Sequence, residues 1–276
     1  MAATSRPAPQ PDELAKLQEL LSGRTWVALT GAGMSTDSGI PDYRGPGARP
    51  TNPVQYADFV LKPEARRRYW ARSMMGYRSF GSAAPNPGHQ ALARLGVPII
   101  TQNVDGLHST AGSAAVIDLH GRIERVICLD CQAKSTRDDL QRRLEQANPQ
   151  VTGAIPAGHA ELRPDGDADI ADPTDFRVVS CQACAGTLKP DVVFFGENVP
   201  VDQVTDSFAL VDAADVLVVA GSSLTVFSGL RFVRHAAKTG TPVVIINHGP
   251  TRGDDLARLK ITAGTSETLT RISLVR

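Results

Sequence analysis

Residues 27–45 read VALTGAGMSTDSGIPDYRG, an apolar run that ends in a glycine-rich turn. A dinucleotide-binding turn reads G-x-G-x-x-G after such a strand, and its glycines let the backbone approach a pyrophosphate closely. Gly31 and Gly33 supply the first half of this pattern, but Thr36 stands where the third glycine belongs. The stretch therefore predicts a buried strand, a tight turn and a phosphate-bearing ligand, which the free N–H groups of a following helix would help to bind.

The residues after this turn do not favour a hydride-transfer enzyme. In a dehydrogenase the pattern continues through a helix to a second strand that ends in Asp or Glu about 20 residues on. Residues 38–53 are instead rich in proline and glycine, which predicts a long loop. Because Gly-x-Gly alone also occurs in ordinary strand-to-helix turns, the function has to be inferred from further motifs.

The composition is that of a globular protein with an ample core. The chain has 276 residues, 42% of them hydrophobic, and a formal net charge of zero. This balance gives no whole-chain basic field for nucleic acid, and no apolar run approaches the roughly 18 residues that a membrane span needs. Residues 1–20 lack an apolar signal core. We therefore expect a cytoplasmic protein without membrane or direct nucleic-acid partners.

Strands of continuous apolar character alternate with helical segments along most of the chain. The strands are predicted at residues 25–30, 97–108, 114–121, 191–197, 215–224 and 241–249. This alternation is typical of an α/β fold with a doubly wound, Rossmann-like parallel sheet covered on both faces. Between residues 122 and 189 the character changes to cysteine pairs, a polar helix and a Pro/Gly/Asp-rich stretch, which predicts a smaller inserted module.

All four cysteines fall into two C-x-x-C pairs, which are Cys128 with Cys131 and Cys181 with Cys184. This set is typical of a closed, tetrahedral structural zinc site. Residues 132–180 separate the pairs, which is more than the about 15–20 residues usual between such pairs, but the loop-rich insert explains the excess. A redox role is the alternative, although redox C-x-x-C motifs come singly on a strand-to-helix turn.

Three further segments pass from an apolar strand into small and hydrogen-bonding residues, at 101–108, 220–229 and 246–255. In a doubly wound sheet the ligand lies at the carboxyl ends of the strands. One polar strand end is commonplace, but four in one chain, with the glycine turn, indicate a long polar ligand laid across the sheet edge.

These motifs together carry a resemblance to a known family. GAGMSTDSGIPDYRG, TQNVDGLH, LHG, the two C-x-x-C pairs, KPDVVFFGE, GSSLTVFSG and INHGPTR resemble the sirtuins, which are NAD-dependent protein deacylases. The likeness runs from about Leu17 to the C-terminus with the motifs in family order, and RRRYWARSMMGY, RPDGD and GPTRGDDLA resemble the class II branch. It implies an NAD-binding Rossmann-like domain of residues 1–45, 86–125 and 190–276, with a small helical and zinc-binding domain of residues 46–85 and 126–189.

The resemblance explains the incomplete glycine pattern, because sirtuins cleave NAD as a co-substrate and do not use it as a hydride carrier. The pyrophosphate needs the glycine turn, while residues 35–45 resemble a lid over the nicotinamide ribose. By position, the resemblance assigns to NAD the residues Gly31, Ala32, Gly33, Thr36, Ile40, Asp42, Tyr43, Arg44, Gln102, Asn103, Asp105, Gly221, Ser222, Ser223, Asn247, His248, Gly249 and Thr265.

His120 and Asn103 are the catalytic residues that the resemblance implies. In the family reaction the acyl-lysine carbonyl oxygen attacks the ribose C1′ and nicotinamide leaves. The histidine then takes a proton from a ribose hydroxyl, and the products are free lysine and O-acyl-ADP-ribose. A near-neutral pKa suits a histidine to this work. Of the other histidines we expect His89, His108 and His235 to be structural, and we assign no role to His159.

An extended acyl-lysine protein substrate is expected to lie between DVVFFGE and LTVFSG, where it gains main-chain hydrogen bonds. The substrate residues implied are Tyr69, Arg72, Val193, Phe194, Phe195, Gly196 and Val226. Tyr69 and Arg72 are three apart on a helix, and a Tyr-x-x-Arg pair binds an acyl carboxylate in desuccinylating sirtuins. Arg72 belongs equally to the arginine-rich run around it, typical of a solvated face. We expect acidic acyl groups, of a glutaryl type, to be preferred.

Two other functions use the same residues. ADP-ribosyl transfer to protein shares NAD binding and an electrophilic ribose C1′, and the pocket residues do not separate it from deacylation. A non-catalytic zinc module that senses NAD is the second alternative. His120 and QNVDG argue against a sensor, because a sensor needs no base.

Overall fold

The computed structural model describes residues 7–43, 53–152 and 175–274. Its centre is a six-stranded parallel sheet in the order β3-β2-β1-β7-β8-β9. The strands are β1 (Trp26–Thr30), β2 (Ile99–Thr101), β3 (Val116–Asp118), β7 (Val216–Ala220), β8 (Val243–Ile246) and β9 (Leu259–Ile261). Counted within this sheet alone, the order is that of the doubly wound fold, with its switch point between β1 and β7. The predicted Rossmann-like sheet is therefore confirmed.

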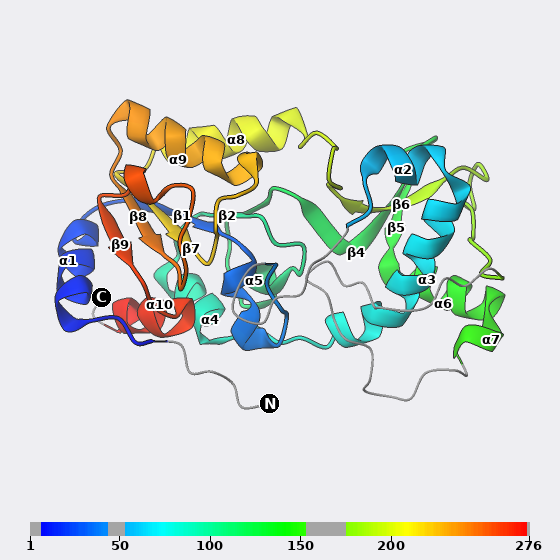
Figure 1. The fold of residues 1–276 in the computed structure, drawn as a ribbon, viewed down its shortest axis with the longest axis horizontal. Helices are drawn as coiled ribbons and strands as arrows, with labels where there is room; N and C mark the ends of the chain where they lie inside the picture. Colours follow the sequence, from blue (N-terminus) through cyan, green and yellow to red (C-terminus); the bar gives the residue numbers. More distant parts are fainter. Residues whose placement is uncertain (1–6, 44–52, 153–174, 275–276) are drawn as a thin grey trace.

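Helices cover both faces of this sheet (Figure 1). One face carries α1 (Pro11–Leu21), α4 (Pro87–Leu95) and α10 (Thr265–Ser273), the other α8 (Val201–Asp212) and α9 (Phe227–Thr239), and the short α5 (Leu107–Thr110) follows β2. All of β1 is buried, because Trp26 and Ala28 enter one hydrophobic cluster whereas Val27 and Leu29 enter the other. Burial on both faces is the reason that the strand is continuously apolar in sequence.

Helix α4 shows how local sequence sets an element's ends. The side chain of Asn86 accepts hydrogen bonds from the backbone N–H groups of Gly88 at 2.9 Å and His89 at 3.2 Å. Pro87 occupies the first turn, where its missing N–H costs nothing. Gly96 ends the helix with a φ of 65°, a left-handed conformation that glycine adopts without strain. The helix therefore begins and ends where the sequence directs it.

The second part of the molecule is a small module beside the parallel sheet (Figure 1). It contains an antiparallel sheet in the order β5-β4-β6, built from β4 (Gly121–Cys128), β5 (Lys134–Thr136) and β6 (Leu188–Val192). Its helices are α2 (Tyr56–Leu61), α3 (Pro63–Phe80), α6 (Arg137–Ala147) and α7 (Pro149–Thr152). Phe59, Trp70 and Leu140 pack with strand residues in a separate hydrophobic cluster. The module thus has a core of its own.

The prediction that residues 191–197 return the chain to the parallel sheet is wrong. The strand there is β6, which ends at Val192 and pairs antiparallel with β4. A short apolar run does not specify which sheet it will join, because that depends on pairing partners far away in sequence. The division into the two domains given above stays a prediction.

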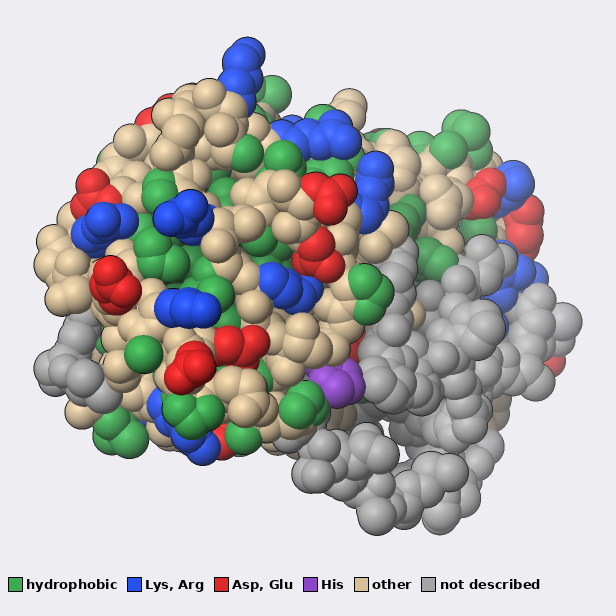
Figure 2. Space-filling view, turned by 60° about the vertical axis from the view of Figure 1, so that its left-hand side comes forward, with side chains coloured by type: hydrophobic (Ala, Val, Ile, Leu, Met, Phe, Trp, Pro, Cys, Tyr) green, Lys and Arg blue, Asp and Glu red, His purple; other side chains and the backbone are tan. Residues whose placement is uncertain are grey.

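In the described ranges no helix is both long and apolar enough to cross a bilayer. On the face drawn in Figure 2, positive and negative side chains are interspersed rather than gathered into fields of one sign. This face therefore offers no broad basic surface of the kind that binds nucleic acid.

Candidate active site and metal centre

The glycine turn after β1 is pressed against the loop after β7. The Gly31 N–H donates to the carbonyl oxygen of Ala220 at 3.1 Å, and the Gly33 N–H donates to that of Gly221 at 2.8 Å. A Cβ added to Gly33 would lie 2.9 Å from the Gly221 oxygen, and one on Gly221, whose φ is 67°, would lie 2.3 Å from the Met34 nitrogen. The glycines are therefore required by the contact of two backbones at the switch point.

The residues after this turn form two single-turn 3-10 helices, at Ala32–Met34 and Thr36–Ser38, and not the α-helix that a dinucleotide turn predicts. The Thr36 hydroxyl donates to the Gly33 carbonyl at 3.0 Å. The threonine at the place of the third glycine therefore adds a hydrogen bond within the turn. A glycine there would allow a following helix to pack closely against the strand.

A cavity of about 1240 Å³ opens at the carboxyl ends of these strands. Its described lining brings together most of the predicted site: Gly31, Ala32, Gly33, Ile40, Asp42, Tyr43, Tyr69, Gln102, Asn103, Asp105, His120, Val193, Phe194, Phe195, Gly196, Gly221, Ser222, Ser223, Val226, Asn247, His248, Gly249 and Thr265. Thr36 and Arg72 are not among the lining residues, and Arg44 and His159 lie outside the described residues.

A hydrogen-bonded chain fixes the polar wall of the cavity. The Asn103 side-chain amide donates to the Gly31 carbonyl and to the Ser35 hydroxyl, both at 3.0 Å. Ser35 in turn donates to Asp105 at 2.6 Å. Burial raises the pKa of the Asp105 carboxyl, and the Ser35 hydrogen bond opposes that shift. The sequence pattern missed Ser35, although it stands inside the quoted turn.

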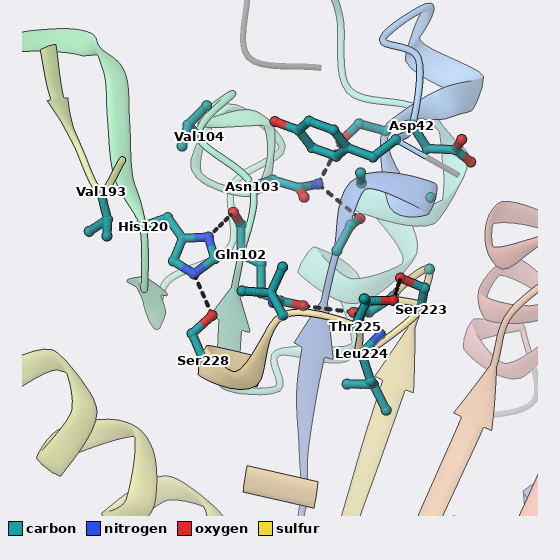
Figure 3. Close-up of a pocket in the computed structure, with 18 of the residues that line it drawn as sticks. Asp42, Gln102, Asn103, Val104, His120, Val193, Ser223, Leu224, Thr225 and Ser228 are labelled. Carbon is teal, nitrogen blue, oxygen red and sulfur yellow. Dashed lines mark hydrogen bonds between the residues drawn. The ribbon is translucent and has the colours of Figure 1, made fainter. Parts of the chain in front are cut away.

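His120 is held by both ring nitrogens (Figure 3). Its Nδ1 lies 2.9 Å from the backbone oxygen of Gln102, and its Nε2 lies 2.8 Å from the Ser228 hydroxyl. A carbonyl oxygen only accepts hydrogen bonds, so Nδ1 carries the proton and donates to Gln102. The lone pair of Nε2 then accepts a hydrogen bond from the Ser228 hydroxyl. The imidazole is thus held in the tautomer that has a basic nitrogen on the Ser228 side.

The same surroundings keep His120 uncharged. Burial lowers its pKa to about 4, the Gln102 carbonyl raises it in part, and the charge of Arg231 lowers it further. At neutral pH the ring is therefore a free base. The sequence prediction took Gly221, Ser222, Ser223 and Val226 from residues 221–229 but missed Ser228, and it also missed Arg231. The spacing of three between Ser228 and Arg231, on a helix that starts within the motif, was the available signal.

The four cysteines form the predicted metal centre in the small module. Their Sγ atoms all lie within 4.8 Å of one another, with Cys128 and Cys184 at 3.5 Å and Cys131 and Cys181 at 3.8 Å. Four sulfurs about 2.3 Å from a tetrahedral zinc ion are separated by about 3.8 Å. The donor set and its spacing therefore fit a closed zinc site, and none of the four lines the cavity.

The two C-x-x-C turns fold in the same way. The residue after each second cysteine is left-handed, with a φ of 61° at Gln132 and 60° at Ala185. The Gln132 N–H donates to the Cys128 carbonyl at 3.0 Å, and the Ala185 N–H donates to that of Cys181 at 2.9 Å. Equivalent turns that present four thiols to one point indicate a structural metal site and not a redox pair.

The comparison with protein families matches residues 31–228 to the model described as the Sir2 family. The chain belongs to the Sir2 family. It is 52% identical to NAD-dependent protein deacetylase 1 of Mycobacterium avium, over 93% of each chain. It is 51% identical to NAD-dependent protein deacetylase 1 of Streptomyces coelicolor, over 96% of this chain and 90% of the relative. A solved structure titled Sir2-p53 peptide-NAD+ matches with a TM-score of 0.75 and 33% identity, over 95% of this chain and 98% of that one.

Two other histidines of this Sir2 protein are structural, as expected. The rings of His89 and His108 are in tilted contact with their centroids 4.7 Å apart, and His108 Nε2 lies 2.9 Å from the Thr30 hydroxyl. Burial lowers their pKa values to about 4 and about 3. His235 instead contacts Asp212 at the surface, with 2.5 Å between Nε2 and Oδ1.

The buried histidines make the fold sensitive to acid. Each binds a proton in the unfolded chain below pH about 6.5 but not in the folded one, so the free energy of unfolding should fall as pH falls, by roughly 1.4 kcal/mol per pH unit for each histidine. We expect His108→Gln to have a shallower slope between pH 7 and 5 in urea unfolding. Leu92→Ala, in the same core but without a titrating group, should lower stability with the wild-type slope. Parallel slopes for wild type and His108→Gln would contradict this.

Proposed function

We propose that the chain is an NAD-dependent protein-lysine deacylase that moves an acyl group from lysine to ADP-ribose and releases nicotinamide. The observation that carries this proposal is the setting of His120, an uncharged base whose Nε2 faces one end of the cavity. The glycine turn lines the same cavity. A dinucleotide and an acyl-lysine can therefore reach one imidazole from two sides.

The residues present are suited to NAD. The cavity wall offers the backbone at Gly31 and Gly33 to the pyrophosphate, and the hydroxyls of Ser222 and Ser223 to phosphate or ribose. At the adenosine end, His248 Nδ1 is buried and has no hydrogen-bond partner among the described residues. A buried polar atom without a partner costs free energy that a ligand hydrogen bond removes.

When bound, NAD supplies the ADP-ribose that accepts the acyl group. His120 takes the proton of a ribose hydroxyl at Nε2, because Nδ1–H is committed to Gln102. The Ser228 hydroxyl keeps that nitrogen aligned, and Asn103 and Asp105 hold the polar wall through Ser35. Water then completes the release of free lysine, so acyl-lysine, NAD and water give lysine, nicotinamide and O-acyl-ADP-ribose.

The peptide part of the substrate is proposed to lie between residues 193–196 and Val226. Phe195, Val226 and Phe227 are 39%, 37% and 54% exposed although they are apolar and line the cavity. One backbone edge of Phe195 is already occupied, because its carbonyl accepts from the Tyr56 N–H at 2.8 Å. We therefore propose that the exposed apolar side chains contact apolar groups of the peptide. Main-chain hydrogen bonds to the peptide would come from backbone groups other than the Phe195 carbonyl.

The acyl preference stays a prediction from the sequence. Tyr69 lines the cavity and packs edge-on against Phe194 at 5.1 Å, which suits contact with an acyl chain. Arg72 is half-buried and lies outside the described lining. If Arg72 nevertheless recognises an acyl carboxylate, Arg72→Met should lower kcat/KM on glutaryl-lysine about tenfold or more relative to acetyl-lysine. Equal losses on both substrates would assign Arg72 to the helix surface.

Mass spectrometry of the products from NAD and a panel of acyl-lysine peptides tests the function itself. Deacylation predicts unmodified lysine and O-acyl-ADP-ribose in equal amounts with nicotinamide. ADP-ribosyl transfer to protein, the alternative, predicts a peptide that gains ADP-ribose and keeps its acyl group. A protein that binds NAD but yields no product would support the sensor alternative. We further propose a cytoplasmic location, because a four-thiolate metal site suits a reducing compartment.

A further inference from the structure

One charged side chain in the cavity is assigned no contact with a substrate in the reaction proposed above. Of the described residues that line the cavity, Arg231 is the single lysine or arginine. It lies on α9, three residues after Ser228, so the two project from one side of the helix. Ser228 contacts His120, as Figure 3 shows, so Arg231 lines the cavity one helical turn beyond the residue that contacts the imidazole.

The Arg231 side chain contacts an aromatic ring and has one nitrogen without a hydrogen-bond partner among the described residues. Its carbon lies 5.2 Å from the centre of the Phe227 ring. Its Nε atom is buried, and no residue in the described part of the chain accepts a hydrogen bond from it. Two acidic groups of the lining are engaged elsewhere, since Glu197 pairs with Lys189 at 3.1 Å and Asp105 accepts from Ser35. A polar atom that is buried without a hydrogen-bond partner costs free energy unless a ligand provides one.

The form of this side chain limits what the ligand is. A guanidinium presents its N–H groups as a planar fork that matches a carboxylate in two parallel hydrogen bonds. The Phe227 ring offers the guanidinium a cation–π contact and takes up none of its N–H donors in a hydrogen bond. The phosphates of NAD are assigned above to the glycine turn and not to Arg231.

We propose that Arg231 forms a subsite for a carboxylate of the acyl-lysine substrate. The proposal rests on the deacylase function above and deepens it by naming the substrate class. The carboxylate belongs either to the acyl group or to an acidic side chain next to the modified lysine. The chemistry of recognition is the same in both, and the Arg231 charge close to His120 then meets an opposite charge when substrate binds.

Three peptides of otherwise neutral sequence separate the two sources: one with acetyl-lysine, one with glutaryl-lysine, and one with acetyl-lysine beside a glutamate. The quantity to measure is kcat/KM on each acidic peptide divided by kcat/KM on the neutral one. Arg231→Met is expected to lower this ratio about tenfold or more for at least one acidic peptide, as for a hydrogen bond to a charged group. The peptide whose ratio falls identifies the source of the carboxylate. The ratio for Arg231→Lys should lie between those for Arg231→Met and wild type.

Arg234→Met is the matched control, because Arg234 is exposed, lies over the same Phe227 ring at 5.9 Å and does not line the cavity. Its ratios should equal those of wild type. The inference is overturned if Arg231→Met leaves both ratios unchanged, if it raises only the KM for NAD, or if the wild type accepts neither acidic peptide while accepting the neutral one. A wild type that deacylates none of the three peptides overturns the deacylase proposal instead, so the two failures are distinct.

Discussion

Replacing Cys131 or Cys184 by serine is expected to leave little soluble, folded protein. Metal–thiolate binding free energy becomes folding free energy when the site forms only in the folded chain, and it amounts to roughly 10–16 kcal/mol in zinc-finger peptides. Here Cys128 and Cys181 also belong to the hydrophobic cluster of the small module. Loss of one ligand therefore removes the metal and loosens a core that holds the antiparallel sheet.

The measurements are soluble yield, zinc per chain by elemental analysis, and thermal unfolding. Ala133→Ser is a suitable control, because it places the same hydroxyl on an exposed residue two positions from Cys131 that is no ligand. Purified wild type that contains no zinc, has four reactive thiols and is fully active would show that the site has no structural metal.

His120→Ala should abolish net deacylation while NAD binding stays near the wild-type level. A general base contributes about 10²- to 10⁴-fold to a rate, and in this cavity the nitrogen that takes the proton is fixed by two hydrogen bonds. The assay is steady-state release of free lysine, with NAD binding followed by calorimetry. His120→Tyr should behave in the same way.

His235→Ala controls for the general loss of a histidine. Its imidazole contacts Asp212 on the surface and is not part of the cavity lining, so its rate should match wild type. If His120→Ala or His120→Tyr kept turnover within a few-fold of wild type, another group would have to supply the base.

The parallel sheet was predictable because its strands are buried on both faces and so are continuously apolar in sequence. The site was predictable in outline for a related reason, since the carboxyl ends of parallel strands meet at one edge and polar residues there must converge. The cysteines were predictable because thiolate spacing is a strict local signal. Each of these features is signalled by a pattern within a short stretch of sequence, even where the stretches themselves are far apart along the chain.

The features that escaped prediction depend on contacts between distant segments. β6 has an apolar run like those of the parallel strands, and only its pairing with β4 places it in the other sheet. Residue type alone does not distinguish Ser228 from the other serines, and its contact with His120 joins residues 108 positions apart. Arg137 lies in a polar helix by sequence, yet it is fully buried over the Tyr77 ring, and burial lowers its pKa to about 10.

Strand β4 has a consequence for how such a protein fails. It begins at Gly121, next to His120, and its eighth and last residue is Cys128, so it spans about 25 Å. Its pairing with β6 shifts register between Gly121 and Val126. His120, the proposed catalytic base, and Cys128, a cysteine of the metal site, thus lie at opposite ends of one strand. We therefore expect a chelator that removes the ion to lower activity through the strand that leads to His120, without competing with either substrate. In a partly demetallated preparation, total activity should follow the zinc content while kcat per zinc-bound molecule stays constant.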